Sequence, residues 1–371
     1  MKNNTATDSD SIRIKKVQVS AYKIPTDAPE ADGTFRWNST TLILVQIEAG
    51  GQTGIGYSYA TEATATLIHT ALIDLVVRQN AMDIPAINIS LMRHIRNNGV
   101  CGISMMAVSA IDNALWDLKA KLLHMPLCLL LGKVRDEMLI YGSGGFTSYT
   151  KQQLQKQLGD WANEGIRYVK MKIGTQPEKD LQRVQQAREA IGDTTQLFVD
   201  ANGAYTVKQA LEKAQAFTQY NVTWFEEPVS SDNLKGLQYI RQRAPFSMNI
   251  AAGEYGYNPW YFETMLDAGA VDILQADATR CGGITNFLKA GYICEAHQLP
   301  FSSHCAPALH LQAALAMPTF FIAEYFHDHV RIERLLFDGI PPPVNGTIKP
   351  DLSRPGLGFE FKYQDAEKYK I

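Results

Sequence analysis

Cysteine is scarce in this sequence, with five residues in a chain of 371. They are Cys101, Cys128, Cys281, Cys294 and Cys305. An odd number of widely spaced thiols, none in a Cys-x-x-Cys pair, argues against a disulfide framework and against a cysteine-based zinc site. This usage is typical of a reducing compartment, so we expect a cytoplasmic protein.

Long apolar runs and an excess of one charge are also absent. No apolar run approaches the ~18 residues that a membrane-spanning helix needs, and the first residues, MKNNTATDSDS, lack the apolar core of a signal peptide. We expect residues 1–11 to form a short disordered lead. The net charge is -3 without a lysine- or arginine-rich run, which argues against nucleic-acid and membrane partners and favours small-molecule chemistry.

Residues 12–137 combine strand and helix patterns. The strand-like runs IRIKKVQVSAYKI and TTLILVQIEAGGQTGIGYS come first, and a stretch with the i, i+3, i+4 spacing of an amphipathic helix follows. Its apolar positions are Ala107, Ala110, Ile111, Ala114, Leu115, Leu118 and Leu122. Strands followed by helices predict an α+β domain over residues 12–137.

Between residues 138 and 337, short β-rich runs alternate with longer helical stretches. The runs are LIYGSGGF, RYVKMKIG, TQLFVDANG, VTWFEEP, MNIAAGE, VDILQADA, LPFSSHC and FFIAEYF. Eight βα units in roughly 200 residues predict a (β/α)8 barrel near the lower end of its size range. Residues 338–371, rich in proline and glycine, are expected to pack back on the N-terminal domain.

The ends of these runs carry polar side chains about one βα unit apart. They are Lys170 and Lys172, Asp200 and Asn202, Glu226 and Glu227, Glu254, Asp277, His304 and Glu324. In a barrel the C-terminal strand ends meet at one mouth, where catalytic groups lie. The sequence therefore predicts a shared site at this mouth.

Three acids in consecutive runs, Asp200, Glu226 and Glu254, would supply carboxylate oxygens from three directions. This arrangement suits Mg²⁺ with positions left for substrate oxygens and water. Each acid alone could simply follow a strand or cap a helix. Without a cation, three such acids in register would repel one another.

Two lysines share one face of the run RYVKMKIG. The two-residue strand period places Lys170 and Lys172 toward the barrel axis and the alternating apolar residues toward the helices. A buried ammonium beside another ammonium and a divalent ion should have a lowered pKa, which would let it accept a proton. The alternative is a solvated face of an edge strand.

Asp277 and His304 end adjacent runs, so the carboxylate could fix the imidazole in one tautomer and raise its basicity. This pair would form a second base opposite the lysine. Glu324, one run further, could donate a hydrogen bond to a substrate carboxylate if protonated, or could be a partner of His304 or of an arginine. The HDH sequence at positions 327 to 329 could bind a metal ion but is interpreted as a solvated loop, and His310 receives no role.

The ordered motifs KMK, DANG, FEEP, GE, DAT with GG, SSH and AE closely resemble the mandelate racemase group of the enolase superfamily over essentially the whole chain. The resemblance implies a barrel closed by an α+β capping domain, with Asp200, Glu226 and Glu254 as Mg²⁺ ligands. It also implies that Lys172 and the His304/Asp277 pair are bases on opposite faces of the substrate. The further implied roles are substrate-carboxylate contact for Lys170, assistance near the metal for Asn202 and electrophilic donation for Glu324.

The segment TDAPEADGTFRWNST, with Trp37 near its end, offers polar groups suited to a polyhydroxylated substrate. Arg280 stands where mandelate racemase would have lysine, which resembles the acid-sugar dehydratases. We therefore expect dehydration of an aldonate or aldarate to a 2-keto-3-deoxy acid through an enediolate. Polar loop residues are, however, also expected wherever a loop is exposed.

Two alternatives stay open. A racemase, epimerase or cycloisomerase would use the same enediolate and would exchange the α-hydrogen without loss of water. A non-catalytic barrel that binds a sugar acid is the other. The resemblance also suggests a homo-oligomer, a dimer or an octamer.

Overall fold

The computed structural model describes residues 12–371, so the predicted disordered lead lies outside the described residues. The chain first forms an antiparallel three-stranded sheet in the order β1-β2-β3. Its strands are β1 (Lys16–Ala31), β2 (Arg36–Ala49) and β3 (Gln52–Tyr59). Both faces of β2 are apolar, since Ile43, Val45 and Ile47 belong to the core shared with the helices that follow, and Leu42 and Leu44 belong to the core shared with the barrel.

Helices cover one face of this sheet. They are α1 (Glu62–Leu67), η1 (Ile68–Leu72), α2 (Ile73–Val76), α3 (Ile84–Ile95), α4 (Gly102–Leu122) and α5 (Leu127–Leu131). The periodic apolar residues predicted to form a helix lie in α4, and those from Ala107 to Leu118 are buried. Gly54 and Gly56 of β3 let α4 approach closely, because a Cβ atom at either position would meet the α4 backbone.

Eight parallel strands follow and close into a barrel, as predicted. They are β4 (Met138–Gly144), β5 (Tyr168–Lys172), β6 (Gln196–Asp200), β7 (Val222–Glu226), β8 (Asn249–Ala252), β9 (Ile273–Ala276), β10 (Phe301–Ser303) and β11 (Phe320–Phe326). Neighbours pair in chain order, and β11 closes the barrel on β4 with Glu324 opposite Tyr141. All eight predicted runs are strands, and the (β/α)8 fold with an N-terminal cap is confirmed.

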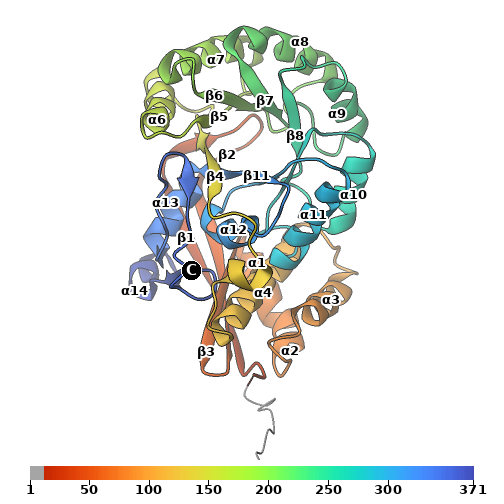
Figure 1. Cartoon of the computed structure of the whole chain (residues 1–371), viewed down its shortest axis with the longest axis vertical. Coiled ribbons are helices and arrows are strands. Elements are labelled where there is room, and N and C mark those ends of the chain that lie inside the picture. The colour runs from red at the N-terminus through yellow and green to blue at the C-terminus, as the bar shows by residue number, and fades with distance from the viewer. Residues whose placement is uncertain (1–11) are drawn as a thin grey trace, which may run out of the picture.

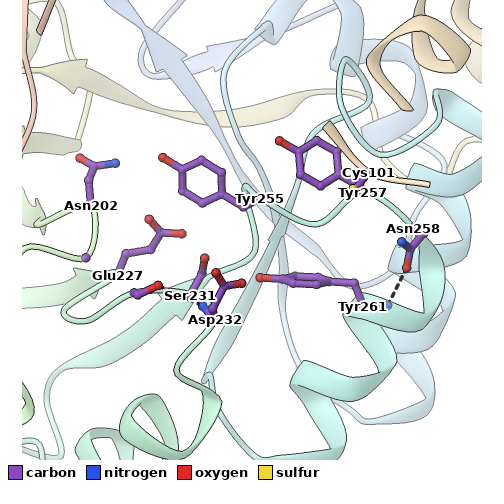
Figure 2. Close-up of a pocket in the computed structure, with 11 residues that line it drawn as sticks. Cys101, Asn202, Glu227, Ser231, Asp232, Tyr255, Tyr257, Asn258 and Tyr261 are labelled. Atoms are coloured by element: carbon purple, nitrogen blue, oxygen red, sulfur yellow. Dashed lines mark hydrogen bonds between the residues drawn. The ribbon is translucent and has the colours of Figure 1, made fainter. Parts of the chain in front are cut away.

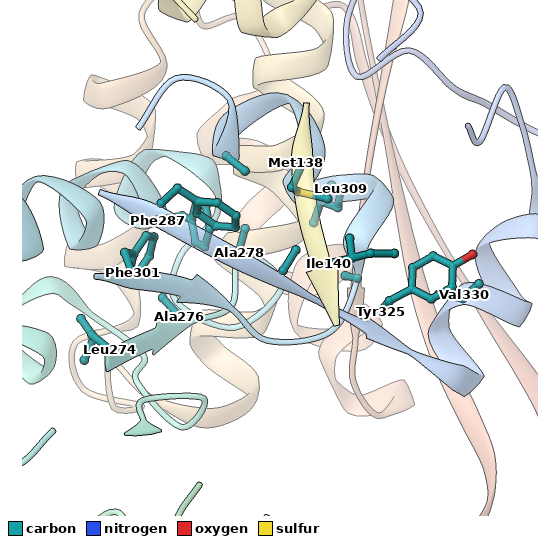
Figure 3. Close-up of a cluster of buried hydrophobic side chains, with 14 of the residues drawn as sticks. Met138, Ile140, Leu274, Ala276, Ala278, Phe287, Phe301, Leu309, Tyr325 and Val330 are labelled. Carbon is teal, nitrogen blue, oxygen red and sulfur yellow. The ribbon is translucent and has the colours of Figure 1, made fainter. Parts of the chain in front are cut away.

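Helices form the outer layer of the barrel, and the cap lies to one side of it (Figure 1). The helices are α6 (Lys151–Asn163), α7 (Pro177–Ile191), α8 (Val207–Phe217), α9 (Leu234–Arg241), α10 (Pro259–Asp267), α11 (Ile284–Ala296), α12 (Pro307–Ala314) and α13 (His327–Leu336). Phe287 of α11 packs against Phe301 of β10 with ring centroids 5.0 Å apart, and Leu309 of α12 lies beside Met138 of β4 (Figure 3). No helix in residues 12–371 has the length and apolar character required to cross a bilayer.

The C-terminal segment contacts both parts of the molecule. Its short elements are β12 (Phe337–Asp338), β13 (Thr347–Ile348), β14 (Glu360–Phe361), α14 (Tyr363–Ala366) and η3 (Glu367–Tyr369). β13 pairs with β4 of the barrel, and β12 pairs with β14. The Phe361 ring lies 5.1 Å from that of Tyr22 in β1, and the Ile371 amide donates to the Ala21 carbonyl at 3.0 Å.

The connection between β1 and β2 is seated on the barrel mouth. The amide of Thr147 donates to the Ala31 carbonyl at 2.8 Å, and the Thr175 hydroxyl donates to the Asp32 carbonyl at 2.7 Å. Gly33 leaves no room for a side chain, since a Cβ atom would lie 2.7 Å from the Ile173 carbonyl oxygen. This close backbone approach closes the cap over the strand ends.

Candidate active site

Strand register brings three of the predicted residues to one level of the barrel. Lys172 on β5 pairs with Asp200 on β6, and Asp200 pairs with Glu226 on β7. Glu254 follows β8 after a single intervening glycine. Oxygens of Asp200, Glu226 and Glu254 lie within 4.8 Å of one another, and all three side chains are buried. The three acids predicted to bind metal therefore converge.

The backbone beyond the strand ends is strained at four residues that are not glycine. Asn202, Glu227, Cys305 and Ala306 have φ values of 46°, 38°, 51° and 40°. Such conformations cost of order 1–3 kcal/mol each and cluster at functional sites. Asn202 and Glu227 follow two of the three converging acids, and Cys305 follows His304.

The converging acids fit Mg²⁺ by their chemistry. All three offer hard oxygen donors, and Oε2 of Glu254 accepts no hydrogen bond. Burial and the nearby Asp200 carboxylate raise the pKa of Glu226 well above its usual range. A divalent cation would neutralise this surplus of buried negative charge.

The two predicted lysines point into the barrel, and the alternating residues Val169 and Met171 pack outward. Nζ of Lys170 forms ion pairs with Glu226 and, at 2.9 Å, with Glu324. Lys172 forms an ion pair with Asp200. Both lysines are buried, which excludes the solvated-face alternative.

By themselves, the protein groups around the two lysines do not give the lowered pKa that the sequence predicts. Burial by itself lowers the pKa of Lys172, but the neighbouring carboxylates, Asp200 first, outweigh burial and raise it. The pKa of Lys170 is raised in the same way, chiefly by Glu226 and Glu324. The prediction also counted a divalent ion bound by the same acids, and such an ion would offset the effect of their charge on both lysines.

His304 and Asp277 form the predicted pair. Nδ1 of His304 lies 2.8 Å from Oδ2 of Asp277, and both side chains are buried. Burial alone would raise the pKa of Asp277, but the hydrogen bond and charge of His304 hold it below its usual range. Nε2 of His304 lies 3.5 Å from Oε2 of Glu254. The imidazole thus connects the pair to the acid cluster.

Glu324 lies within β11 and makes contacts expected of a carboxylate. It accepts from the Ser143 hydroxyl at 2.6 Å and from the Cys305 amide at 2.8 Å, besides its ion pair with Lys170. Burial would raise its pKa, yet the Lys170 ammonium holds the pKa well below the usual range. Nε2 of His304 lies 3.8 Å from Oε2 of Glu324, so the predicted partner His304 and also Lys170 face this carboxylate.

A cavity of about 410 Å³ lies between barrel and cap. Its barrel side includes Lys172, Asn202, Glu254, Asp277, Arg280 and His304. Its cap side includes Asp32, Phe35, Trp37, Thr40, Tyr59 and Thr61. The predicted bases and one predicted metal ligand thus share a cavity with three predicted substrate-contact residues, Asn202, Arg280 and Trp37. The other two, Lys170 and Glu324, are fully buried and do not line it.

Three predicted substrate-contact residues occupy different positions around this cavity. The backbone amide of Asn202 donates to Oδ1 of Asp200 at 2.8 Å. The side-chain oxygen of Asn202 is buried and has no hydrogen-bond partner. The Arg280 guanidinium donates to the Glu254 carbonyl at 3.2 Å. Trp37 Nε1 donates to Glu30 at 2.7 Å, which fixes the indole against the cavity.

A second cavity, of about 540 Å³, adjoins the first, and Asn202 and Tyr255 line both. Figure 2 shows Glu227 and Asp232 facing the rings of Tyr255 and Tyr261 there. Burial and the nearby Glu254 raise the pKa of Glu227 well above its usual range. The mouth of the barrel therefore opens to two polar chambers.

Sequence reasoning missed His310, which supports the His304/Asp277 pair. Nε2 of His310 accepts from the Ala278 amide at 2.8 Å and lies 3.7 Å from Oδ1 of Asp277. His310 is fully buried in α12 among apolar residues. That apolar context was the available signal, because a buried histidine needs polar partners.

The solvated-loop interpretation of HDH is wrong. These residues begin α13, where Asp328 and His329 are buried. His329 lines the cavity and stacks on Tyr59 with ring centroids 3.5 Å apart, and the Thr40 hydroxyl donates to Asp328 at 2.5 Å. The error arose because neither Tyr59 nor Thr40 is near this segment in sequence.

Comparison with known protein families gives two matches that together cover most of the chain. Residues 17–132 match the mandelate racemase/muconate lactonizing enzyme N-terminal domain, and residues 153–366 match the enolase C-terminal domain-like family. L-talarate/galactarate dehydratase of Salmonella typhimurium is 32% identical over 329 residues, covering 85% of this chain and 82% of that protein. D-galactarolactone cycloisomerase of Agrobacterium fabrum is 29% identical, covering 97% and 99%.

Comparison with solved structures gives the same family. A mandelate racemase/muconate lactonizing enzyme-like protein from Rubrobacter xylanophilus superposes with a TM-score of 0.95 at 50% identity, covering 97% of this chain and 100% of its own. A racemase from Streptomyces coelicolor with bound magnesium gives 0.91 at 29% identity, covering 96% and 100%. The expected enzyme class, a lyase with isomerase as the alternative, is confirmed by these relatives. The chain belongs to the mandelate racemase/muconate lactonizing enzyme family of the enolase superfamily.

Proposed function

We propose that this protein is a Mg²⁺-dependent acid-sugar dehydratase. It removes the proton α to a substrate carboxylate and expels the β-hydroxyl as water, and the resulting enol becomes a 2-keto-3-deoxy acid. The observation that carries the proposal is the placement of Lys172 and the His304/Asp277 pair around one cavity beside three converging acids. The similarity to L-talarate/galactarate dehydratase of Salmonella typhimurium supports this proposal.

Asp200, Glu226 and Glu254 would hold the ion, which supplies positive charge against the substrate carboxylate and makes its α-proton more acidic. The magnesium bound in a similar solved structure supports this choice of ion. Lys170, held between Glu226 and Glu324 and one strand repeat below Lys172, adds a fixed ammonium beneath the acid cluster. Charge that develops on the substrate thus meets positioned cations.

Proton transfer falls to Lys172 and His304. Their strands, β5 and β10, are separated by β4 and β11 on one side and by β6 to β9 on the other, so the two groups approach the substrate from different directions. Since Nδ1 of His304 is committed to Asp277, Nε2 is the nitrogen that exchanges a proton with substrate. We propose that one group takes the α-proton and that imidazolium returns a proton to the departing hydroxyl.

The cap side of the cavity favours a substrate with one carboxylate. Hydroxyl and aromatic side chains dominate it, and Asp32 adds a carboxylate. Burial lowers the pKa of His329 to about 3, so this imidazole is neutral. All lysine and arginine residues that line the cavity, Lys172 and Arg280, belong to the barrel side. A hydroxylated tail fits this wall better than a second carboxylate, so we propose an aldonate rather than an aldarate.

A cycloisomerase or racemase is the second candidate, because it needs the same bases and the same α-proton. The cycloisomerase relative aligns over almost its whole length, and a racemase is among the similar structures. A non-catalytic sugar-acid-binding barrel is the least favoured reading. We further expect a homo-oligomer, a dimer or an octamer, and a cytoplasmic location.

The decisive experiment is a screen of the Mg²⁺-saturated protein against matched aldonic and aldaric acids, with semicarbazone detection of 2-keto-3-deoxy products. Lys172→Ala, which lacks one of the two bases, is the control. Product that requires both Mg²⁺ and Lys172 would establish dehydration. Exchange of the α-hydrogen in D₂O without a keto product would instead establish the isomerase alternative, and neither signal with an acid that the protein is shown to bind would support a binding role.

A further inference from the structure

A second group of metal-binding side chains lies where the cap meets the barrel, apart from the proton-transfer residues. Asp27 and Glu30 come from the end of β1, and His327 begins α13. One ligand atom from each residue lies within 4.8 Å of the others. Nε2 of His327 is 2.9 Å from Oδ2 of Asp27. These spacings are close to those between ligands of one bound ion.

Glu30 supplies an independent sign that a cation belongs here. Its side chain is only 1% exposed, and Oε1 has no hydrogen-bond partner. Oε2 accepts from Trp37 Nε1. Burial, together with the charges of Asp328 and Asp27, raises the pKa of Glu30 to about 9. An unpartnered oxygen on a buried acid is costly, and a bound cation would remove that cost.

The surroundings give this group a dry inner side and an open outer side. Trp37 packs edge-on against Phe146 at 5.7 Å, and Phe146 contacts His327 at 6.4 Å between ring centroids. Asp27 and His327 are partly exposed, so an ion can enter from solvent. Arg331 does not neutralise Glu30 directly, because its guanidinium donates to Asp328 and to the Pro25 carbonyl.

We propose that Asp27, Glu30 and His327 form a second divalent-metal site that takes Zn²⁺ or a similar transition-metal ion. An imidazole with two carboxylates suits Zn²⁺, with water as a fourth ligand, whereas Mg²⁺ prefers oxygen ligands alone. The site joins β1 of the cap to α13 of the barrel, and through Glu30 it fixes Trp37 at the cavity wall. It stands whether or not the protein is a dehydratase.

The test counts Zn²⁺ ions bound to the full chain in the presence of excess Mg²⁺, by calorimetry and elemental analysis. We compare the unmodified protein with His327→Ala and Glu30→Gln. The matched control is His297→Ala, since His297, Glu263 and Asp267 form a group of the same residue types without a buried member. Co²⁺ serves as a spectroscopic probe of ligand number, read from its visible absorption.

We expect one Zn²⁺ equivalent that His327→Ala and Glu30→Gln each weaken at least tenfold and that His297→Ala leaves unchanged. Zn²⁺ should also raise the melting temperature of the unmodified protein more than that of His327→Ala. Equal stoichiometry and affinity in His327→Ala, or loss of the ion only in His297→Ala, would overturn the proposal. His327 is partly exposed, so its replacement tests the site even if Glu30→Gln fails to fold.

Discussion

Nδ1 of His304 lies 2.8 Å from Oδ2 of Asp277, in a buried contact that leaves Nε2, 3.2 Å from Sγ of Cys305, as the nitrogen that can exchange a proton with substrate. Asp277→Asn should therefore lower kcat by about 10²–10⁴-fold, because an amide neither fixes this tautomer nor stabilises the imidazolium. Steady-state kinetics on the substrate found in the screen measures this. Asp272→Asn, which changes an acid at the other end of β9 that pairs with Arg241, should retain kcat. Equal losses in both variants would contradict the assigned role.

Lys172→Arg should abolish turnover although it keeps the positive charge. An arginine side chain does not lose its proton at physiological pH, so it cannot accept one from carbon. We expect kcat to fall at least 10³-fold while Mg²⁺ affinity, measured by calorimetry, changes less than tenfold. Lys208→Arg, on an exposed surface of α8, is the control. Residual activity near the unmodified level would show that Lys172 only pairs with Asp200.

Glu254→Gln should weaken Mg²⁺ binding at least tenfold. The amide keeps the size of the side chain but supplies a neutral oxygen where three carboxylates converge. Calorimetric titration of the metal-free protein with Mg²⁺ measures the change. Glu263→Gln, a partly exposed acid on α10, should bind as the unmodified protein does. Unchanged affinity in Glu254→Gln would remove this residue from the ligand set.

Gly33→Ala should raise KM and make the cap more susceptible to limited proteolysis. A Cβ atom at Gly33 meets carbonyl oxygens of Ile173 and Ala201, so the β1–β2 connection must lift from the mouth. Gly159→Ala in α6, where a Cβ atom finds ordinary contacts, should instead leave KM unchanged and stabilise the fold by about 0.5–1 kcal/mol. A Gly33→Ala variant with normal KM and protease resistance would mean that the cap tolerates displacement.

Glu333→Gln should become more stable than the unmodified protein as pH rises. Burial raises the pKa of Glu333 to about 8 in the folded state, although Tyr57 donates to it at 2.6 Å. Between about pH 4.5 and 8 the unfolded chain therefore binds fewer protons than the folded one at this site, and stability falls with pH by at most ~1.4 kcal/mol per unit. Urea unfolding of both proteins across this range tests the sign. Parallel stability curves would contradict the shift.

Much of the fold and of the barrel side of the site could be predicted, because both depend on local periodicity. The two-residue period placed Lys170 and Lys172 inside the barrel, and the parallel strands brought Asp200, Glu226 and Glu254 to one level. The strand ends meet at the same mouth in any such barrel, so no long-range information was required.

The remaining contacts join distant segments, and sequence periodicity does not encode them. Tyr59 stacks on His329, and Thr40 donates to Asp328, across the cap–barrel interface. His310 supports Asp277 from a helix with no polar pattern of its own. The lysine pKa directions likewise depend on a balance of nearby charges that spacing alone does not give.

Because the β1–β2 connection is seated on the barrel mouth, the proton-transfer groups and the wall that faces the rest of the substrate are encoded in different parts of the gene. The groups that move protons come from residues 172 to 304, while the hydroxyl and aromatic wall comes largely from residues 32 to 61. After gene duplication, a few substitutions in this short N-terminal segment could therefore change the substrate of one copy. The proton-transfer groups would stay the same in both copies, so homologous enzymes that share these groups need not share a substrate.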